Sequence, residues 1–285
     1  MNQLKIAIQK SGRLSEKSLE LISEAGISLN NSDRKLITKA SNFPIEVLFL
    51  RDDDIPQYVA DGVADIGIVG ENVIMEKSSP IEIVEKLGFA KCRLCLAIPK
   101  SVDYKGLSYF NGKKLATSYP NILRKFLDEK KIQCEIHEIS GSVEIAPGIG
   151  LADGIFDIVS SGSTLISNGL VEVEEIIRSE AVIIGNPNMS EEKRKTLKKL
   201  LFRIGAVQRG NKHKYVVLNA PADKVSKIIT IIPGMKSPTV VPLAKEGWVS
   251  IHSVLLEADF WEIIDQLQEC GAQGILVMPI EKMIV

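Results

Sequence analysis

The sequence predicts an α/β protein of several compact parts, and three observations carry that prediction. Strand–turn–helix units repeat from residue 4 to residue 184, which is typical of a largely parallel sheet covered by helices. Residues 212–285 follow the order βαββαβ, the ferredoxin-like pattern. A chain of 285 residues is also too long for one typical core and fits two or three compact units.

The first unit begins with a strand predicted at Leu4–Gln9, whose apolar residues suit a strand buried on both faces. A polar turn, Lys10–Arg13, leads into a helix predicted at Leu14–Ala25, which Gly26 ends. The next predicted elements are a strand at Ile45–Leu50, a short helix at Pro56–Asp61 and a strand at Ala64–Val69.

A second unit is predicted to begin near Cys92. Its elements are strands at Cys92–Pro99, Lys114–Thr117, Glu135–Ile139 and Ile155–Ser160, with helices at Pro120–Lys130 and Val143–Ala152. Strand-like alternation over Gly169–Ile184 is expected to carry the chain back to the first unit, which makes the second unit an insertion. A helix rich in Lys and Glu is predicted to follow at Ser190–Ile204.

The third part alternates clearly between strand and helix patterns. Strands are predicted at Lys214–Asn219, Thr239–Leu243, Trp248–Leu256 and Gly274–Ile280, with helices at Asp223–Ile231 and Asp259–Cys270. Modules of this kind can bind small regulators between copies, or they can serve oligomerisation alone. The predicted domains are residues 1–91 with 181–211, residues 92–180, and residues 212–285.

Composition excludes several classes of protein. A net charge of −1 gives no basic field of the kind that nucleic-acid binding needs. No stretch approaches the ~18 apolar residues that a membrane helix requires, and the N-terminus has neither signal-peptide nor transit-peptide character. The four cysteines do not form a disulfide framework and indicate a reducing compartment. We therefore expect a cytoplasmic protein that binds neither nucleic acid nor membrane.

The candidate binding site is the segment Asp157–Leu165, which we call the cradle. A strand leads into a turn whose hydroxyls come from Ser160, Ser161, Ser163 and Thr164, and Gly162 leaves backbone N–H groups accessible. Such a turn suits a phosphate dianion, and the Asp157 carboxylate could accept hydrogen bonds from ribose hydroxyls. The cradle therefore fits a sugar 5-phosphate, although the same composition is found in plain surface turns.

Charged segments near the N-terminus supply further candidates. Lys10 and Arg13 follow the first strand, at the edge where open α/β sheets place ligands, and they could clamp a pyrophosphate or triphosphate. Solvated surface charge explains them equally well. The run Asp52–Asp54 could gather Mg²⁺ or cap the helix that follows. Arg34 and Arg51 are additional cationic candidates.

Several other motifs fail on spacing. No Gly-x-x-x-x-Gly-Lys-Ser/Thr run is present, which argues against the usual P-loop. The glycines of Gly148–Gly154 lack a leading strand and the spacing of a dinucleotide fingerprint. Cys92 and Cys95 lie three apart in a strand and so face opposite sides, which disfavours shared zinc. The three histidines are scattered, and no nucleophile–His–Asp arrangement is apparent.

Spaced motifs over nearly the whole chain resemble those of one family. The run Glu144-x5-Gly150-x-Ala152-x2-Ile155-x-Asp157-Ile158-x2-Ser161-Gly162-x-Thr164-Leu165 is similar to the signature of the ATP phosphoribosyltransferases. The resemblance extends to Gln9–Leu14, Arg51–Pro56, Asp65–Asn72, Ala116–Pro120 and Pro279–Met283. The C-terminal module resembles the histidine-sensing domain of the family's long form.

The resemblance implies a fold, a reaction and roles for particular residues. It implies two α/β domains like type II periplasmic binding proteins, with the active site in their cleft, and a C-terminal ferredoxin-like (ACT-like) domain. It implies transfer of phosphoribose from phosphoribosyl pyrophosphate to N1 of ATP with Mg²⁺, in dimers or hexamers inhibited by histidine and AMP. The metal ligands stay unassigned.

By the same resemblance, residues Asp157 and Ser160–Thr164 bind the ribose 5-phosphate, and Arg13 and Arg34 lie near the pyrophosphate. Lys10 and Gly12 lie near the nucleotide or its phosphates. The histidine site comprises Asn219, Met235, Thr239, Val254 and Gly274. Asn219 stands where some relatives are expected to carry an acid.

Three other functions share parts of these features. A ligand-binding or sensor protein could use the same two-domain cleft without turnover. A salvage phosphoribosyltransferase is expected to have two adjacent acids before the cradle, whereas here Phe156 precedes a single Asp157. An inactive regulatory subunit is disfavoured by the intact cradle and by the turn at Lys10–Arg13.

Overall fold

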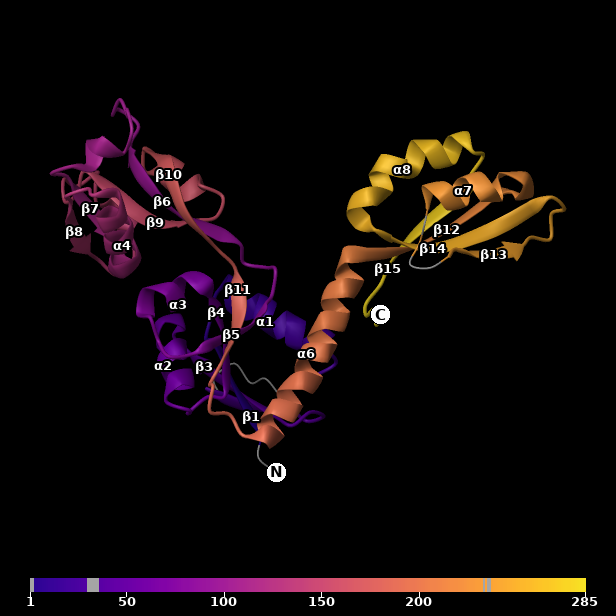
Figure 1. Ribbon diagram of the computed structural model, residues 1–285, viewed down its shortest axis with the longest axis horizontal. Helices are drawn as coiled ribbons and strands as arrows, with labels where there is room; N and C mark the ends of the chain where they lie inside the picture. Colours follow the sequence, from indigo (N-terminus) through magenta and orange to yellow (C-terminus); the bar gives the residue numbers. More distant parts are fainter. Residues whose placement is uncertain (1–2, 30–35, 233, 235–236) are drawn as a thin grey trace. The chain divides into compact units, whose positions relative to one another are not determined.

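The computed structural model describes residues 3–29, 36–232, 234 and 237–285 (Figure 1). The chain forms two compact units, residues 1–20 with 28–197 and residues 21–27 with 198–285. The first unit holds a six-stranded and a five-stranded sheet, and the second unit holds a four-stranded sheet. The predicted domain boundaries, which divide the first unit further, stay a prediction.

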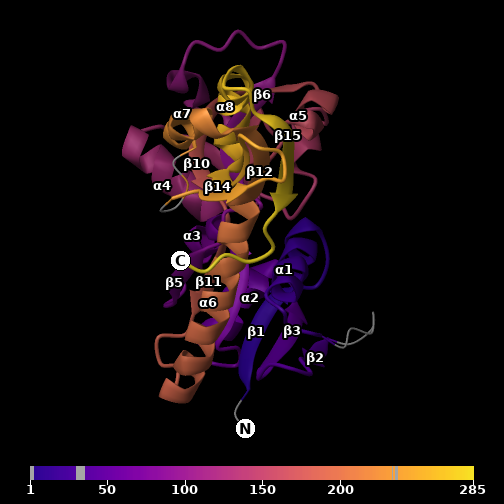
Figure 2. The same cartoon turned by 90° about the vertical axis from the view of Figure 1, so that its right-hand side faces the viewer.

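The first sheet has the strand order β2-β3-β1-β4-β11-β5. Its strands are β1 (Leu4–Gln9), β2 (Ile37–Lys39), β3 (Ile45–Leu50), β4 (Ile66–Gly70), β5 (Glu82–Lys86) and β11 (Ala181–Gly185). Strand β1 pairs in parallel with β3 and β4, whereas β2, β11 and β5 join antiparallel. Figure 2 shows β1, β3 and β2 side by side in that order. The sheet is therefore mixed, where the sequence predicted a largely parallel one.

The helices of this lobe follow the parallel strands. They are α1 (Arg13–Glu24), the short 3-10 helix η1 (Asp52–Asp54), α2 (Ile55–Ala60) and α3 (Glu71–Lys77). Apolar residues of β1, β4 and β11 pack with Ile55 and Val59 of α2 and with Val73 of α3. Strand β4 is buried at four of its five positions, as a strand covered on both faces must be.

The second sheet has the order β10-β6-β9-β7-β8. Its elements are β6 (Cys92–Pro99), η2 (Leu107–Phe110), β7 (Lys114–Thr117), α4 (Pro120–Lys130), β8 (Glu135–Glu138), η3 (Val143–Ile145), β9 (Gly154–Val159), α5 (Ser163–Ser167) and β10 (Leu170–Ser179). Leu94, Leu96 and Ile98 are fully buried against Phe110 and Phe156. Each such side chain contributes roughly 1.5–3 kcal/mol when it is withdrawn from water.

The chain returns to the first sheet as predicted, but through two strands. Strand β10 pairs with β6 in the second sheet, and β11 pairs with β4 and β5 in the first. The two crossing segments are themselves joined, because Leu87 N donates to the Ala181 carbonyl at 2.9 Å and Ala181 N donates to the Phe89 carbonyl at 3.0 Å.

One predicted helix is wrong. Only a 3-10 turn forms at Val143–Ile145, and turns follow in place of a helix up to Ala152. Pro147 lacks an N–H, and Gly150 has a φ of +75°, so a helical ladder cannot continue through this stretch.

The second unit is built around the ferredoxin-like order β13-β14-β12-β15, with all pairs antiparallel. Its elements are the long helix α6 (Glu191–Lys212), which begins in the first unit, then β12 (His213–Pro221), η4 (Ala222–Lys224), α7 (Val225–Ile231), β13 (Thr239–Pro242), β14 (Trp248–Leu256), α8 (Glu257–Glu269) and β15 (Gln273–Pro279). Helix α6 is longer than predicted. Its Gly210 is required, because an added Cβ there would lie 2.5 Å from the Ile280 carbonyl oxygen.

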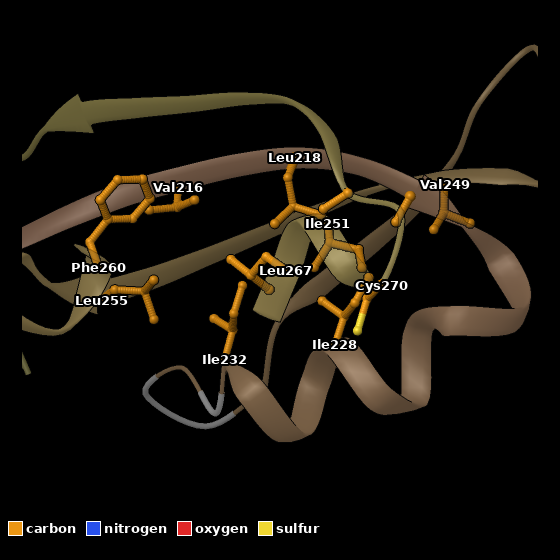
Figure 3. Packing of buried hydrophobic residues seen from close by; sticks show 12 residues of the cluster. Val216, Leu218, Ile228, Ile232, Val249, Ile251, Leu255, Phe260, Leu267 and Cys270 are labelled. Carbon is orange, nitrogen blue, oxygen red and sulfur yellow. The ribbon is translucent and has the colours of Figure 1, made fainter. Parts of the chain in front are cut away.

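Helices α7 and α8 cover the same face of this sheet (Figure 1). Figure 3 shows Ile228 of α7, Ile232 directly after it and Leu267 of α8 packed toward Leu218 and Ile251 of the strands. The α/β fold class, with two cleft-forming domains and a C-terminal ferredoxin-like domain, is thus confirmed. Within the described ranges, no helix combines the length and the apolar character that spanning a membrane needs.

Candidate active site

The parallel strands of the first sheet bring three polar segments to one edge. Strands β1, β3 and β4 end at Gln9, Leu50 and Gly70, and the carboxyl ends of parallel strands meet at the same edge of a sheet. The turn Lys10–Arg13, which we call the cationic turn, is joined to β3 there, since Lys10 N donates to the Leu50 carbonyl at 2.8 Å. Arg51–Asp54 and Glu71–Asn72 follow the other two strands.

A pocket of about 380 Å³ lies at this edge and draws residues from both lobes. That volume suits a small-molecule ligand. Its walls include Gln9, Arg13 and Lys17 beside the first sheet, together with Tyr119, Ile158 and Ser160 from the second lobe; the remaining residues are Leu14, Asp52, Gly70, Asn72, Val73, Ala90, Lys91 and Cys92. Arg13 of the cationic turn and Ser160 of the cradle therefore line one cavity.

The cradle is held by short-range hydrogen bonds. Gly162 has a φ of +81°, a left-handed conformation that favours glycine, and it directly precedes α5 as its N-cap residue. The Ser161 hydroxyl lies 3.0 Å from the Ser163 hydroxyl and accepts from Ser163 N at 3.4 Å. The side chains of Ser160, Ser161, Ser163 and Thr164 are otherwise exposed and available to a ligand.

Asp157 lies on β9, at the start of the cradle. The pKa of its carboxyl is raised to about 6, chiefly because burial penalises the charged form. The negative charge of Glu144 acts in the same direction, and a hydrogen bond from the Ile158 backbone opposes it. A strongly shifted carboxyl close to a pocket-lining residue, here Ser160, is typical of functional sites. Burial also raises the pKa of Tyr119, and the charge of Asp157 adds to that effect.

Two sets of hydrogen bonds join the lobes beside this pocket. Asn72, which is only 4% exposed, donates from Nδ2 to the Tyr119 hydroxyl at 3.1 Å and accepts from the Ser179 hydroxyl at 2.8 Å. The Glu76 carboxylate accepts from the backbone N–H groups of Asn121 and Ile122, at 2.9 and 3.0 Å. Glu76 of α3 thereby caps the first turn of α4 in the other lobe.

A second pocket, of about 500 Å³, adjoins the first and shares Lys91, Cys92 and Ser160 with it. The other lining residues carry mostly charge; they are Glu71, Lys86, Arg93, Glu175, Arg178, Ser179 and Glu180. Arg93 is paired with Glu172 at 2.7 Å, and Lys86 with Glu71 at 3.2 Å.

The predicted site residues of the first unit fall into four groups. Arg13 and Ser160 line the first pocket, and Lys10 and Gly12 lie exposed in the same cationic turn as Arg13. The remaining cradle residues, Asp157 and Ser161–Thr164, flank Ser160 along the chain. Arg34 lies outside the described residues.

Sequence reasoning assigned no role to several residues of the pocket. Asn72 and Tyr119 lie in the motifs Asp65–Asn72 and Ala116–Pro120, which were noted only as points of family resemblance. Lys17 lies one turn beyond Arg13 on α1, so helical spacing could have indicated it. Lys91 lies on a crossing segment, and its contribution depends on the tertiary fold.

No metal cluster is formed by the part of the chain that the structure describes, since no group of three or more His, Cys, Asp or Glu residues is placed to hold an ion. Asp52 nevertheless lines the pocket. The pKa of neighbouring Asp53 is raised by burial and by the charges of Asp52 and Asp54. A cation held among these carboxylates would relieve that repulsion.

Four of the five predicted histidine-site residues lie on the strands of the C-terminal sheet, one on each strand. Asn219 of β12 is close to Gly274 of β15, where an added Cβ would lie 3.5 Å from Asn219 Nδ2. Thr239 pairs with His252, two residues from Val254. Because Val216, Leu218 and Ala220 face the helices, the alternate residue Asn219 faces the uncovered side of the sheet. Met235 lies outside the described residues.

Comparisons with known proteins agree over the whole chain. A family model described as ATP phosphoribosyltransferase matches residues 51–206, and one described as HisG, C-terminal domain, matches residues 210–282. The ATP phosphoribosyltransferase of Bacteroides thetaiotaomicron is 62% identical over 282 residues, covering 99% of this chain and 100% of that protein. That of Cytophaga hutchinsonii is 58% identical over 281 residues, covering 99% and 98%.

A solved structure gives the same result. The ATP phosphoribosyl transferase (HisG:HisZ) complex from Thermotoga maritima has a chain that is 32% identical, with a TM-score of 0.62. The match covers 71% of this chain and 99% of that chain.

Proposed function

Because the chain belongs to the ATP phosphoribosyltransferase family, we propose that the pocket between the cationic turn and the cradle is its active site. The reaction is transfer of phosphoribose from phosphoribosyl pyrophosphate to N1 of ATP, the first step of histidine biosynthesis. The observation that carries the proposal is the single cavity lined by both Arg13 and Ser160.

In this proposal the cradle holds the 5-phosphate of the donor. Its hydroxyls and backbone N–H groups come from residues Ser160–Thr164, and their exposure supports contact with a ligand. Asp157 accepts hydrogen bonds from the ribose hydroxyls. Bonds to a charged acceptor are stronger than neutral ones, so ligand binding would favour the ionised form of this raised-pKa carboxyl.

The cationic turn serves the other end of the donor. Arg13 and Arg34 lie near the pyrophosphate leaving group in this proposal, and Lys10 with Gly12 lies near the nucleotide or its phosphates. The exposure of the Lys10 and Arg13 side chains supports such roles, because their charges are accessible to an anionic ligand.

Charge development explains why these residue types suit the reaction. Breaking the C1–pyrophosphate bond leaves an oxocarbenium-like ribose and a strongly anionic leaving group. Arg13 aimed at the leaving group stabilises the transition state, and such electrostatic contributions are usually the largest in catalysis. Adenine N1 is already a nucleophile, so holding it near C1 matters more than a general base.

Magnesium is proposed to accompany the pyrophosphate. Mg²⁺ usually binds substrate phosphates together with one or two protein carboxylates, and Asp52 on the pocket wall fits that pattern. The ion would neutralise charge on the leaving group. The residues of the chain then have to bind the ribose end, orient N1 and exclude water.

The C-terminal module is proposed to bind histidine as a feedback inhibitor, with AMP as a second inhibitor of the enzyme. The histidine site would comprise Asn219, Met235, Thr239, Val254 and Gly274, in an enzyme that forms dimers or hexamers in the cytoplasm. The closeness of Asn219 and Gly274 supports a shared site. Residues 212–285 would be the regulatory domain, and residues 1–91 with 181–211 and residues 92–180 the two catalytic domains.

The direct test follows formation of the N1-phosphoribosyl adduct by its ultraviolet absorbance, with and without histidine. Activity that histidine inhibits supports both parts of the proposal. Activity that ignores histidine would retain the active site and remove the regulatory role.

Asn219→Asp tests the histidine site itself. An acid at this position can pair with the histidine amino group, so the concentration for half-inhibition should fall by about tenfold, as expected for one charged hydrogen bond. Asp223→Asn, on the same module but outside the proposed site, serves as the control. Equal inhibition of Asn219→Asp and the wild type would move the histidine site elsewhere.

A further inference from the structure

Arg93 of β6 makes a contact that the proposed reaction does not explain. Its Nε donates to the two carboxylate oxygens of Glu172 at 2.9 and 3.1 Å, and its Nη2 donates to Oε2 at 2.7 Å. Its remaining Nη1 donates to the backbone carbonyl of Ser160 at 3.2 Å. Arg93 therefore links β10 to the first residue of the turn in the cradle.

The carbonyl of Ser160 controls the direction of a backbone donor in the cradle. A peptide unit is planar and trans, so the Ser160 carbonyl and the Ser161 N–H point in opposite directions. When Arg93 holds the carbonyl on its own side, the Ser161 N–H is turned away from Arg93. The Ser161 side chain is fixed separately by Ser163.

Glu172 fixes the orientation of the Arg93 guanidinium, which holds the Ser160 carbonyl. A guanidinium is planar and rigid, so a carboxylate that occupies Nε and Nη2 also sets the direction of Nη1. The Arg93 and Glu172 side chains are 31% and 28% exposed, which shields the pair more than a surface pair. Arg178 lines the same pocket but is 84% exposed, and within the described residues its hydrogen bond is to Glu175.

We propose that Arg93, aimed by Glu172, is a positioning residue that orients the Ser160–Ser161 peptide for donor phosphate binding. This inference rests on the proposed role of the cradle. It assigns a function to two charged residues that neither the sequence motifs nor the hydrogen bonds inside the turn explain.

The rival explanation is that Arg93 contacts the phosphate directly, because its side chain also lines the 500 Å³ pocket. The two explanations predict opposite effects of Glu172→Gln. If Arg93 positions the peptide, loss of the carboxylate loosens the guanidinium and weakens phosphate binding. If Arg93 binds phosphate itself, release from its carboxylate leaves binding equal or tighter.

The experiment measures KM for phosphoribosyl pyrophosphate, KM for ATP, kcat, and the affinity for ribose 5-phosphate by calorimetry. The variants are Arg93→Gln, Arg93→Lys and Glu172→Gln, with Arg178→Gln as the matched control. All three variants should raise the donor KM and the ribose 5-phosphate Kd by about tenfold, the worth of one charged hydrogen bond. KM for ATP should stay within about twofold. Arg93→Lys keeps the positive charge but loses the planar guanidinium, whose nitrogens donate in fixed directions. It should therefore not restore the wild-type affinity for ribose 5-phosphate.

The proposal is overturned if Glu172→Gln binds ribose 5-phosphate as well as or better than the wild type. Full rescue by Arg93→Lys would also overturn it. Ser161→Ala with Thr164→Val, made in parallel, separates this inference from the site assignment. If that double variant loses ribose 5-phosphate affinity while the Arg93 and Glu172 variants keep it, only the positioning role fails. If the double variant also keeps its affinity, the cradle assignment itself fails.

Discussion

The cradle and the cationic turn contribute Ser160 and Arg13 to one pocket but are built in different ways. The cradle consists of hydroxyls and backbone donors that are fixed in advance, by the Ser161–Ser163 hydrogen bonds and by Arg93 on Ser160. The cationic turn is fixed only through its backbone. Within the described residues, the side chains of Lys10 and Arg13 have no hydrogen-bond or ion-pair partner.

This difference matches the charges that each region would meet in the proposed reaction. The 5-phosphate keeps the same charge throughout the reaction, so a fixed set of neutral donors can bind it equally in the ground and transition states. Charge on the pyrophosphate grows as the C1 bond breaks, and cations stabilise that growth. Damage to the cradle should therefore raise the donor KM, whereas damage to the cationic turn should lower kcat.

The largest effect is expected from Arg13→Ala. Loss of a cation that acts on the leaving group should lower kcat by about 10²-fold or more, with a smaller change in the donor KM. Steady-state kinetics measures both constants. Arg124→Ala, which removes an exposed arginine of α4 away from the pocket, is the control. An unchanged kcat for Arg13→Ala would remove Arg13 from the catalytic residues.

Asp157→Asn should lower kcat/KM for the donor by about 10- to 100-fold, the range for charged hydrogen bonds to the ribose. The same change should stabilise the fold at neutral pH. The raised pKa means that the folded state disfavours the charged form of Asp157. The contribution of Asp157 to the free energy of unfolding is therefore fully present below pH 3.8, and it is lost as the pH rises through about 6.

The stability gain of Asp157→Asn over the wild type should accordingly be larger at pH 7.5 than at pH 4, by about 3 kcal/mol at most. Urea unfolding of the two proteins at both pH values gives the difference. If the stability difference between Asp157→Asn and the wild type does not change with pH, burial does not destabilise the charged Asp157 carboxylate.

The pH dependence of donor use provides a smaller effect. Below about pH 6 the Asp157 carboxyl is protonated and loses the charge that strengthens its hydrogen bonds from the ribose hydroxyls, so kcat/KM for the donor should fall by up to tenfold per pH unit. The pH profile of the Asp157→Asn variant should lose this fall in kcat/KM at acid pH, whereas the profile of the Arg13→Ala variant should keep it. If the Asp157→Asn variant shows the same fall in kcat/KM at acid pH as the wild type, another titrating group causes it.

The smallest effect is expected from Glu76→Ala, which leaves the N–H groups of Asn121 and Ile122 without their carboxylate. Loss of such a cap costs about 1 kcal/mol. Because the cradle and the cationic turn lie on opposite lobes, kcat should fall by several-fold while ribose 5-phosphate still binds to the cradle. Glu129→Ala on α4 is the control, and a matching loss of ribose 5-phosphate affinity would contradict this separation.

Local patterns in the sequence predicted much of this arrangement. The bounds of β1, β3, β6, β7 and α4 agree with the prediction residue by residue, because buried aliphatic runs and a Pro at the start of a helix are strong local signals. The short edge strand β5 was missed, since Glu82–Lys86 is charged and mostly exposed.

The candidate site could be predicted only where it is continuous in the chain. The cradle is one segment, so its composition indicated it as a candidate, and the ordered motifs identified the family. Asn72 and Tyr119 meet across the two lobes at 3.1 Å, a contact that depends on how both sheets fold. The same holds for Arg93 and Ser160, which are 67 residues apart.

Competition by ribose 5-phosphate tests the central claim most directly. It carries the 5-phosphate and the ribose but no pyrophosphate, so it should compete with phosphoribosyl pyrophosphate through the cradle alone. Ser161→Ala with Thr164→Val should raise its inhibition constant by at least about tenfold, and Arg13→Ala should leave the constant within about twofold. Equal inhibition of the wild type and the cradle variant, or a large loss in Arg13→Ala, would contradict the assignment of the cradle to the donor phosphate.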